Sequence, residues 1–222
     1  MISSSASVFA PGQSGPAGRA ALGASPATIV RKLKAGETLF VEGEPARYCY
    51  EVVSGVMKEY CTLEDGQREI SDFYSAGDFV GVCGHDEQTQ TAEAVTHCLL
   101  RCIPLDALLG RPGFELDGPP KLVDVLVSRL DRSRERSTLI SRRNAEQRVA
   151  GFLRFLSRRS ADAQTISIPM SRQDIGDYLG LTIETVCRTL TEFKRSGVIV
   201  MPTARSFVIQ DEAALDAAEG AL

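Results

Sequence analysis

The sequence predicts an α+β protein: an N-terminal antiparallel β-barrel or jelly roll, then a long helix, then a C-terminal winged helix-turn-helix. Three observations support this order. Glycine turns recur about every ten residues over 29–117, and apolar residues recur at helical spacing over 118–143. Within 144–222, one capped helix, a glycine turn and a second capped helix follow each other directly.

Residues 1–28 are rich in Ser, Ala, Gly and Pro and have no periodic apolar pattern. Such composition does not support a packed core, so this segment is expected to be a flexible tail. From Ile29 onward short apolar stretches alternate with turn signals, as antiparallel strands require. These turn signals are Gly36, Gly43, Gly55, Asp65-Gly66 and Gly77-Asp78.

The helix over 118–143 carries an apolar stripe that extends beyond a single barrel. We expect this stripe to pair with the same helix of a second subunit in a coiled-coil-like homodimer, which would space two DNA-reading helices about one DNA turn apart. The alternative is that it packs on its own barrel. The stripe consists of Leu122, Val125, Leu126, Leu130, Ser133, Ser137 and Ile140.

The C-terminal region begins with an amphipathic helix over 144–157 whose apolar residues are Val149, Phe152, Leu153 and Leu156. Ser171 and Asp174 then form a capping-box pattern. Gly180 can adopt the positive φ of a tight corner, and Thr182 can cap the next helix. Segments 198–201, 203–205 and 206–209 predict a small β-wing in which Arg205 would touch DNA phosphate.

The second helix of this motif separates two faces at about 100° per residue. Val186, Leu190 and Phe193 form the inner stripe, and the outer face holds Glu184, Cys187, Arg188 and Thr191. Arginine donates to O6 and N7 of guanine, and a carboxylate accepts from N4 of cytosine, so Glu184 and Arg188 are expected to read adjacent base pairs. The alternative is an i,i+4 ion pair on a solvated helix.

Charge is distributed unevenly along the chain, although its net charge is −4. Residues 1–127 carry 10 Lys and Arg against 17 Asp and Glu, whereas residues 128–205 carry 15 against 8. The basic region coincides with the helix-turn-helix, as phosphate attraction requires. No apolar run approaches the roughly 18 residues of a membrane span and no signal-type core is present, so a cytoplasmic protein without membrane contact is expected.

Cysteine and histidine placement argues against a metal centre. The six cysteines form no CxxC pair, and Cys98 and Cys102 have no further ligand cluster nearby, so buried strand residues are the expected interpretation. His85 and His97 are twelve residues apart. We therefore expect no metal, no catalytic residue and no cofactor. The alternative from another class is a cupin-like enzyme built on the barrel.

Three strings resemble the CRP/FNR family of transcription regulators, and most of all its FNR/FixK branch, over about residues 29–215. They are LEDGQREISDFYSAGDFVG, SRRNAEQRVAGFL and PMSRQDIGDYLGLTIETVCRTL. The resemblance implies a barrel like that of cyclic-nucleotide-binding domains, a homodimer on double-stranded inverted-repeat DNA, and contact with RNA polymerase. An activator role and low-oxygen, respiratory or nitrogen-oxide regulation are the expectation.

The resemblance also implies roles for individual residues. Glu184 and Arg188 match base contacts, and Ile183 stands where the cyclic-AMP branch has an arginine, which implies a TTGAT-N4-ATCAA-like site. The expected backbone contacts are Ser171, Arg172, Thr182 and Thr185, together with Arg205. The exposed turn at Glu64, Asp65, Gly66 and Gln67 matches a loop that family members use to touch RNA polymerase.

The usual effectors of the family lack their residues here. Val82 replaces the nucleotide-binding glutamate, and no Lys or Arg occurs from Val82 to Glu93. A buried phosphate without a cation is costly, so cyclic-nucleotide binding is not expected. No cysteine precedes Cys49, so the iron–sulfur ligand set is missing. The chain resembles the cofactor-free FixK type; a heme- or nucleotide-responsive sensor is the alternative.

Cys187 replaces the serine usual between the reading glutamate and arginine. Its methylene can still touch a thymine methyl group. An outward thiol near a helix N-terminus and beside Arg188 is also a candidate for oxidation. We therefore expect either a redox brake on DNA binding or a serine substitute without a regulatory role.

Overall fold

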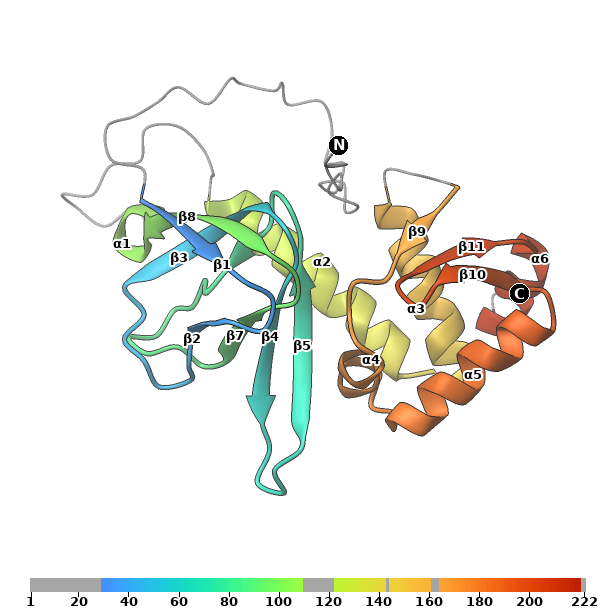
Figure 1. Ribbon diagram of the computed structural model, residues 1–222. Helices are drawn as coiled ribbons and strands as arrows, with labels where there is room; N and C mark the ends of the chain where they lie inside the picture. The colour runs from blue at the N-terminus through green and yellow to red at the C-terminus, as the bar shows by residue number, and fades with distance from the viewer. Residues whose placement is uncertain (1–28, 110–121, 143, 161–163, 221–222) are drawn as a thin grey trace. The chain divides into compact units, whose positions relative to one another are not determined.

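The computed structural model describes residues 29–109, 122–142, 144–160 and 164–220 (Figure 1). The expected tail over 1–28 lies outside these residues. The chain divides into two compact units. Among the described residues, one unit contains the chain up to Cys61 together with Phe73–Asp131. The other contains Thr62–Asp72 and the chain from Arg132 onward.

Eight strands form the N-terminal fold in two four-stranded sheets, with the orders β1-β8-β3-β6 and β2-β7-β4-β5. The pairs β1·β8, β3·β8, β3·β6, β2·β7 and β4·β7 are antiparallel, as expected. The strands are β1 (Val30–Leu33), β2 (Thr38–Phe40), β3 (Tyr48–Ser54), β4 (Met57–Thr62), β5 (Arg68–Tyr74), β6 (Phe79–Val80), β7 (Thr91–Ala94) and β8 (Cys98–Pro104). All five glycines expected at turns have positive φ.

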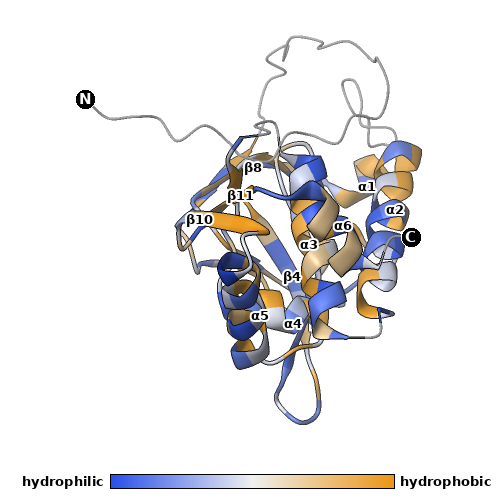
Figure 2. Ribbon diagram, turned by 90° about the vertical axis from the view of Figure 1, so that its right-hand side faces the viewer, coloured by the Kyte–Doolittle hydropathy of each residue, from blue (hydrophilic) through white to orange (hydrophobic). Residues whose placement is uncertain are grey.

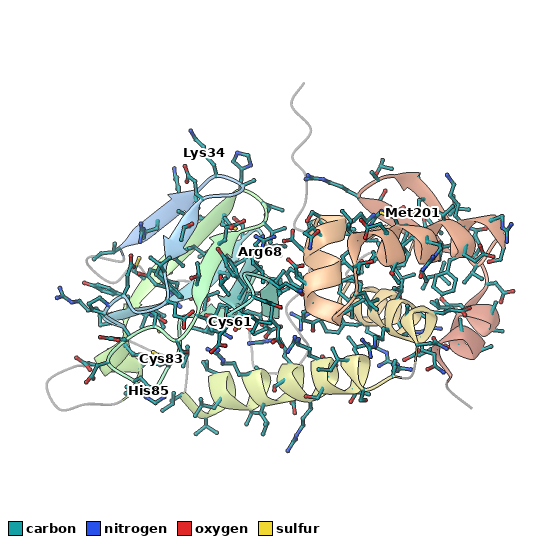
Figure 3. The ribbon with its side chains drawn as sticks, turned by 90° about the horizontal axis from the view of Figure 1, so that it is seen from below. Lys34, Cys61, Arg68, Cys83, His85 and Met201 are labelled. Carbon is teal, nitrogen blue, oxygen red and sulfur yellow. The ribbon has the colours of Figure 1, made fainter. Side chains whose placement is uncertain are left out.

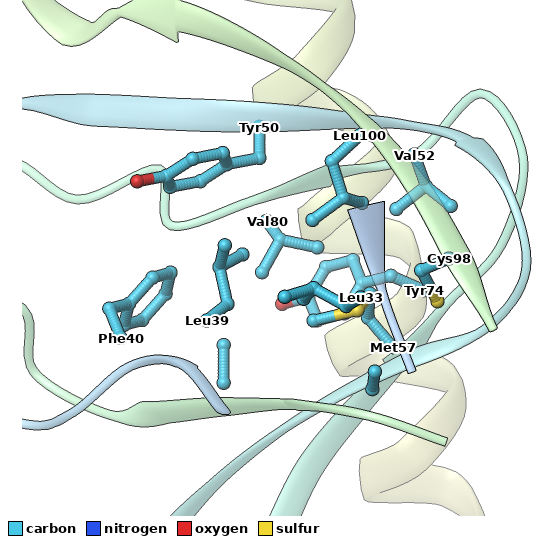
Figure 4. Packing of buried hydrophobic residues seen from close by; sticks show 12 residues of the cluster. Leu33, Leu39, Phe40, Tyr50, Val52, Met57, Tyr74, Val80, Cys98 and Leu100 are labelled. Carbon is cyan, nitrogen blue, oxygen red and sulfur yellow. The ribbon is translucent and has the colours of Figure 1, made fainter. Parts of the chain in front are cut away.

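The barrel core is a cluster to which all eight strands contribute (Figure 4). Phe40 stacks on Tyr50 with ring centroids 6.0 Å apart, and Tyr74 is almost fully buried. Cys98 belongs to this core, so its interpretation as a buried strand residue is confirmed, and Cys102, also on β8, is partly buried against the core. All six cysteines lie within the described residues, and no two of them form a disulfide. Large side chains therefore fill the interior of the barrel.

A short helix, α1 (Leu105–Leu108), and the long helix α2 (Leu122–Ile140) follow the barrel strands. The predicted stripe of α2 needs a correction. Val125 is only 5% exposed and packs with Cys49, Phe79 and other residues of its own subunit, and Leu122 packs partly against the same cluster. The apolar residues exposed on α2 are Val123 (66%), Leu126 (49%), Val127 (51%) and Leu130 (49%).

The C-terminal fold consists of short helices and a three-stranded sheet in the order β10-β11-β9. Asn144 caps α3, accepting a hydrogen bond from the Gln147 N–H at 2.8 Å, and the four predicted apolar residues of α3 are buried. The elements are α3 (Ala145–Arg159), β9 (Ile166–Ser167), α4 (Arg172–Leu179), α5 (Ile183–Arg195), β10 (Ile199–Thr203), β11 (Ser206–Ile209) and α6 (Glu212–Glu219).

Helix α6 was not expected from the sequence. It is short and alanine-rich, with a single fully buried leucine, Leu215, so its apolar periodicity is weak. Asp211 caps its start by accepting from Ala214 N–H at 2.9 Å. Arg154 of α3 holds it through ion pairs with Glu212 and Asp216. Among the described residues, no helix is both long enough and apolar enough to cross a membrane.

Candidate nucleic-acid interface

Helix α4 begins at the predicted capping box. The Oγ atom of Ser171 accepts from Asp174 N–H at 3.0 Å, and Oδ2 of Asp174 accepts from Ser171 N–H at 3.1 Å. Such reciprocal bonds satisfy N–H groups that lack an intrahelical acceptor at a helix start. The predicted cap is confirmed.

The corner between α4 and α5 depends on two glycines. Gly180 ends α4 with φ 64° and ψ 44°, the left-handed conformation expected for it. Gly176 was not singled out from the sequence, yet a Cβ atom there would lie 2.6 Å from the carbonyl oxygen of Leu181. Leu181 N–H in turn donates to Gly176 O at 3.0 Å. The two helices therefore approach closely because position 176 has no side chain.

Helix α5 separates a buried face from an exposed face, as predicted. Thr182 caps it, with Oγ1 accepting from Thr185 N–H at 3.3 Å. Val186, Leu190 and Phe193 are buried. Figure 2 shows hydrophilic residues alternating with hydrophobic ones along this helix. The packing fixes the rotation of α5 about its axis, and so determines which residues face outward.

The exposed face of α5 holds the residues expected to read DNA. Glu184, Cys187, Arg188 and Thr191 are exposed, and so is Ile183 in the first turn. Within the described part of the chain, neither the Glu184 side chain nor the Arg188 side chain makes a hydrogen bond or ion pair, so the i,i+4 ion pair is not formed there. Their donors and acceptors remain available to a ligand.

The β-wing is present as predicted, with β9 as an additional third strand. Its turn is closed by a 2.7 Å hydrogen bond between the hydroxyls of Thr203 and Ser206 and by Arg205 N–H donating to Thr203 Oγ1 at 3.1 Å. The Arg205 carbonyl accepts from Ile168 N–H at 2.8 Å, which fixes the turn to the segment before α4. The Arg205 side chain is exposed, as a phosphate contact requires.

Arg172, which is expected to contact the DNA backbone, also contacts the wing. Its side chain is half-buried, and Nη2 donates to the carbonyl of Ala204 in the wing turn at 2.9 Å. Burial lowers the pKa of its guanidinium below the usual range. The Nη1 atom is buried and has no hydrogen-bond partner among the described residues. Arg172 therefore connects α4 to the wing.

A hollow of about 280 Å³ lies beside the exposed face of α5. Cys187, Thr191 and Lys194 of α5 line one side, and the wing contributes Met201, which Figure 3 labels. Arg172 also lines it. The Cys187 thiol is thus exposed beside two cationic side chains.

The other residues predicted to contact the DNA backbone or RNA polymerase lie at the starts of helices or in a turn between strands. Ser171 and Thr182 are exposed at the starts of α4 and α5, and Thr185 is half-exposed. The turn at 64–67 is exposed between β4 and β5, with Gln67 N–H donating to Asp65 Oδ1 at 2.9 Å. No group of three or more His, Cys, Asp or Glu side chains within the described ranges is arranged to hold a metal.

Comparison with known proteins identifies both halves of the chain. Residues 30–110 match the cyclic nucleotide-binding domain, and residues 147–218 match the Crp-like helix-turn-helix domain. The nitrogen fixation regulation protein FixK of Azorhizobium caulinodans is 36% identical over 201 residues, covering 88% of this chain and 79% of that protein. The fumarate and nitrate reduction regulatory protein of Escherichia coli K12 is 32% identical, covering 77% and 71%.

Solved structures show the same architecture. FixK2 from Bradyrhizobium japonicum superposes with a TM-score of 0.79 at 33% identity, covering 89% of this chain and 100% of that one. A CRP-family regulator from Thermus thermophilus superposes with a TM-score of 0.72 at 22% identity, covering 86% and 96%. These relatives are transcription regulators, which decides against the cupin-like enzyme.

Proposed function

Because the chain belongs to the CRP/FNR family of DNA-binding transcription regulators, we propose that it binds a TTGAT-N4-ATCAA-like inverted repeat as an effector-free homodimer. The observation that carries this proposal is the exposed face of α5. Glu184 and Arg188 are exposed there, and neither side chain is used in a hydrogen bond among the described residues. Arg188 would donate to guanine O6 and N7, and Glu184 would accept from cytosine N4.

Apolar and backbone contacts complete the proposed complex. Ile183 is exposed in the first turn of α5, where it would meet thymine methyl groups together with the methylene of Cys187. The helix starts at Ser171 and Thr182 carry the positive ends of two helix dipoles, which favour phosphate. Thr185 and Arg205 would add further contacts to the DNA backbone. Arg172 would act mainly by holding the wing that carries Arg205.

The homodimer would form through the exposed apolar face of α2. Val123, Leu126, Val127 and Leu130 recur at spacings of three and four residues, and Ser133 and Ser137 continue the same line as small polar residues. Four exposed branched aliphatic side chains on one helix are typical of a helix–helix interface. Val125 lies on the opposite, intramolecular side, so it would support α2 rather than contact the second subunit.

The residues around the expected nucleotide site support DNA binding without a bound effector. Val82 is buried, and the stretch from Val82 to Glu93 contains no Lys or Arg to pair with a phosphate. The barrel interior is filled by Phe40, Tyr50 and Tyr74. A ligand in the barrel interior would need to displace these large packed side chains.

Activation would use the exposed β4–β5 turn to contact RNA polymerase. Glu64, Asp65, Gly66 and Gln67 are all exposed. The turn is ordered by Gly66 N–H donating to Leu63 O at 2.9 Å and by Leu63 N–H donating to Gln67 O at 2.8 Å. A rigid, acidic, exposed turn suits recognition of a basic protein surface.

Oxidation of Cys187 would weaken DNA binding. One molecule of peroxide oxidises the thiol to sulfenic acid and releases water, and a second gives sulfinic acid and another water. The product adds negative charge on the face that meets phosphate. Arg172 and Lys194 line the same hollow, so an oxidised sulfur would also attract Lys194 away from the DNA backbone and disturb the contact of Arg172 with the wing.

A gel-shift titration with purified protein and no added ligand tests this function. The expected result is a dimer complex on the TTGAT-N4-ATCAA duplex at nanomolar protein, with much weaker binding to a duplex whose half-sites are scrambled. Equal binding to both duplexes, or binding that appears only after a cyclic nucleotide or heme is added, would contradict the proposal.

A further inference from the structure

A buried carboxylate in the barrel is joined to the long helix α2. Glu59 of β4 is 2% exposed. Its Oε1 accepts from Gly81 N–H at 2.8 Å, and its Oε2 accepts from the Tyr74 hydroxyl at 2.5 Å and from Arg129 Nη2 at 3.1 Å. A carboxylate is buried at this depth only where such donors surround it. Glu59 therefore collects donors from two barrel segments and one helix.

Arg129 makes several contacts with the barrel from a single position on α2. Its Nη1 donates to the carbonyl of Val82 at 2.7 Å, while Nη2 is bound to Glu59. The guanidinium carbon also lies 5.9 Å from the centroid of the Tyr74 ring, within cation–π range. The fork geometry of arginine allows this simultaneous engagement, which a lysine cannot reproduce. All these residues belong to one compact unit.

The surroundings of Gly81 leave little space for a ligand to replace this network. A Cβ atom at Gly81 would lie 2.9 Å from the Phe40 ring and 3.3 Å from the Gln88 amide nitrogen. The Gly81-Val82 segment is thus covered by side chains of the chain itself. The Gly81 N–H and the Val82 carbonyl are already used in hydrogen bonds with Glu59 and Arg129.

We propose that Glu59 and Arg129 form an internal latch that holds the first turns of α2 on the barrel, in place of an effector. Val125, four residues before Arg129, packs against the barrel on the same side of the helix. Latch and packing together fix the rotation of α2, so that Leu126 and Leu130 face outward without a bound molecule. This inference rests on the proposed function, since it concerns how an effector-free dimer presents its contact surface.

Three variants separate the latch from ordinary stabilisation of the barrel. Arg129→Gln and Glu59→Gln each remove the ion pair. The double variant Glu59→Gln/Arg129→Gln avoids an unpaired buried charge, so it keeps the comparison valid if a single variant unfolds. Arg101→Gln is the matched control, because Arg101 is also paired with a glutamate, Glu51, but joins two barrel strands and does not involve α2.

The measurements are amide hydrogen exchange, dimer dissociation by sedimentation, and affinity for the inverted-repeat duplex. In the Arg129 and double variants we expect faster exchange over residues 122–131, unchanged exchange in β8, and dimer and DNA affinities about tenfold lower or more. Arg129→Lys should give an intermediate effect. Arg101→Gln should leave α2 exchange and dimer affinity as in the unaltered protein.

Unchanged α2 exchange and dimer affinity in the double variant would overturn the latch, and so would an equal loss in Arg101→Gln. Failure of the unaltered protein to bind the duplex would overturn the proposed function instead. In that case hydrogen exchange over residues 122–131 and sedimentation still decide whether the latch positions α2.

Discussion

Arg172 of α4 donates a 2.9 Å hydrogen bond from Nη2 to the carbonyl of Ala204, thirty-two residues along the chain, in the wing turn. This bond connects the helix-turn-helix to the wing that carries Arg205. Arg172→Ala should therefore weaken binding of every DNA sequence alike, by about tenfold, the usual scale for a lost hydrogen bond to a charged group. Gel shifts on the specific and scrambled duplexes measure this loss of affinity. A changed ratio between the two duplexes would assign Arg172 to base reading instead.

Gly176 should tolerate no side chain. In Gly176→Ala, a Cβ would approach the Leu181 carbonyl oxygen to 2.6 Å, so the turn must shift at a cost of about 1–3 kcal/mol of unfolding free energy. Thermal unfolding followed by circular dichroism measures this cost. Gly84→Ala is the control, because nothing lies within 4 Å of its Cβ position. Equal melting temperatures in the two variants would show that the close approach at Gly176 is unimportant.

Cys187→Ser should make DNA binding resistant to peroxide. The unaltered protein should lose affinity on treatment, whereas the serine variant should keep it, because its hydroxyl is not oxidised under these conditions. Burial raises the pKa of Cys49 to about 12, so that thiol stays protonated and unreactive near pH 8. Cys83→Ser, which alters a half-exposed barrel cysteine, should remain sensitive. If Cys187→Ser loses binding as readily as the unaltered protein, the brake lies elsewhere.

Leu126→Glu should separate the subunits. A carboxylate on the apolar face of α2 would be desolvated in a helix–helix interface, and we expect the dimer dissociation constant to rise by at least about a hundredfold. Val41→Glu is the control, because Val41 is nearly as exposed but lies in the barrel. Sedimentation equilibrium distinguishes monomer from dimer. If the Leu126→Glu protein is still a dimer, the apolar face of α2 does not form the dimer interface.

Local patterns were predictable, whereas long-range contacts were not. The capping box of Ser171 and Asp174, the left-handed Gly180 and the buried stripe of α5 each depend on residues close in sequence. The Arg172–Ala204 bond and the Arg129–Glu59 pair join residues 32 and 70 positions apart, and no periodicity encodes them. On α2, spacing alone did not say which apolar residues face the barrel, so Val125, which packs within its own subunit, was expected on the outer stripe, while the exposed Val123 and Val127 were not included in it.

Selection of bound sequences from a random DNA pool tests the central claim most directly. The unaltered protein, without added ligand, should enrich TTGAT-N4-ATCAA-like inverted repeats. Arg188→Ala should lose about 1–3 kcal/mol of affinity and relax one guanine position, while Arg158→Ala, at an exposed arginine late in α3, should enrich the same site as the unaltered protein. Enrichment of no inverted repeat, or of the same repeat after Arg188→Ala, would contradict reading by the exposed face of α5.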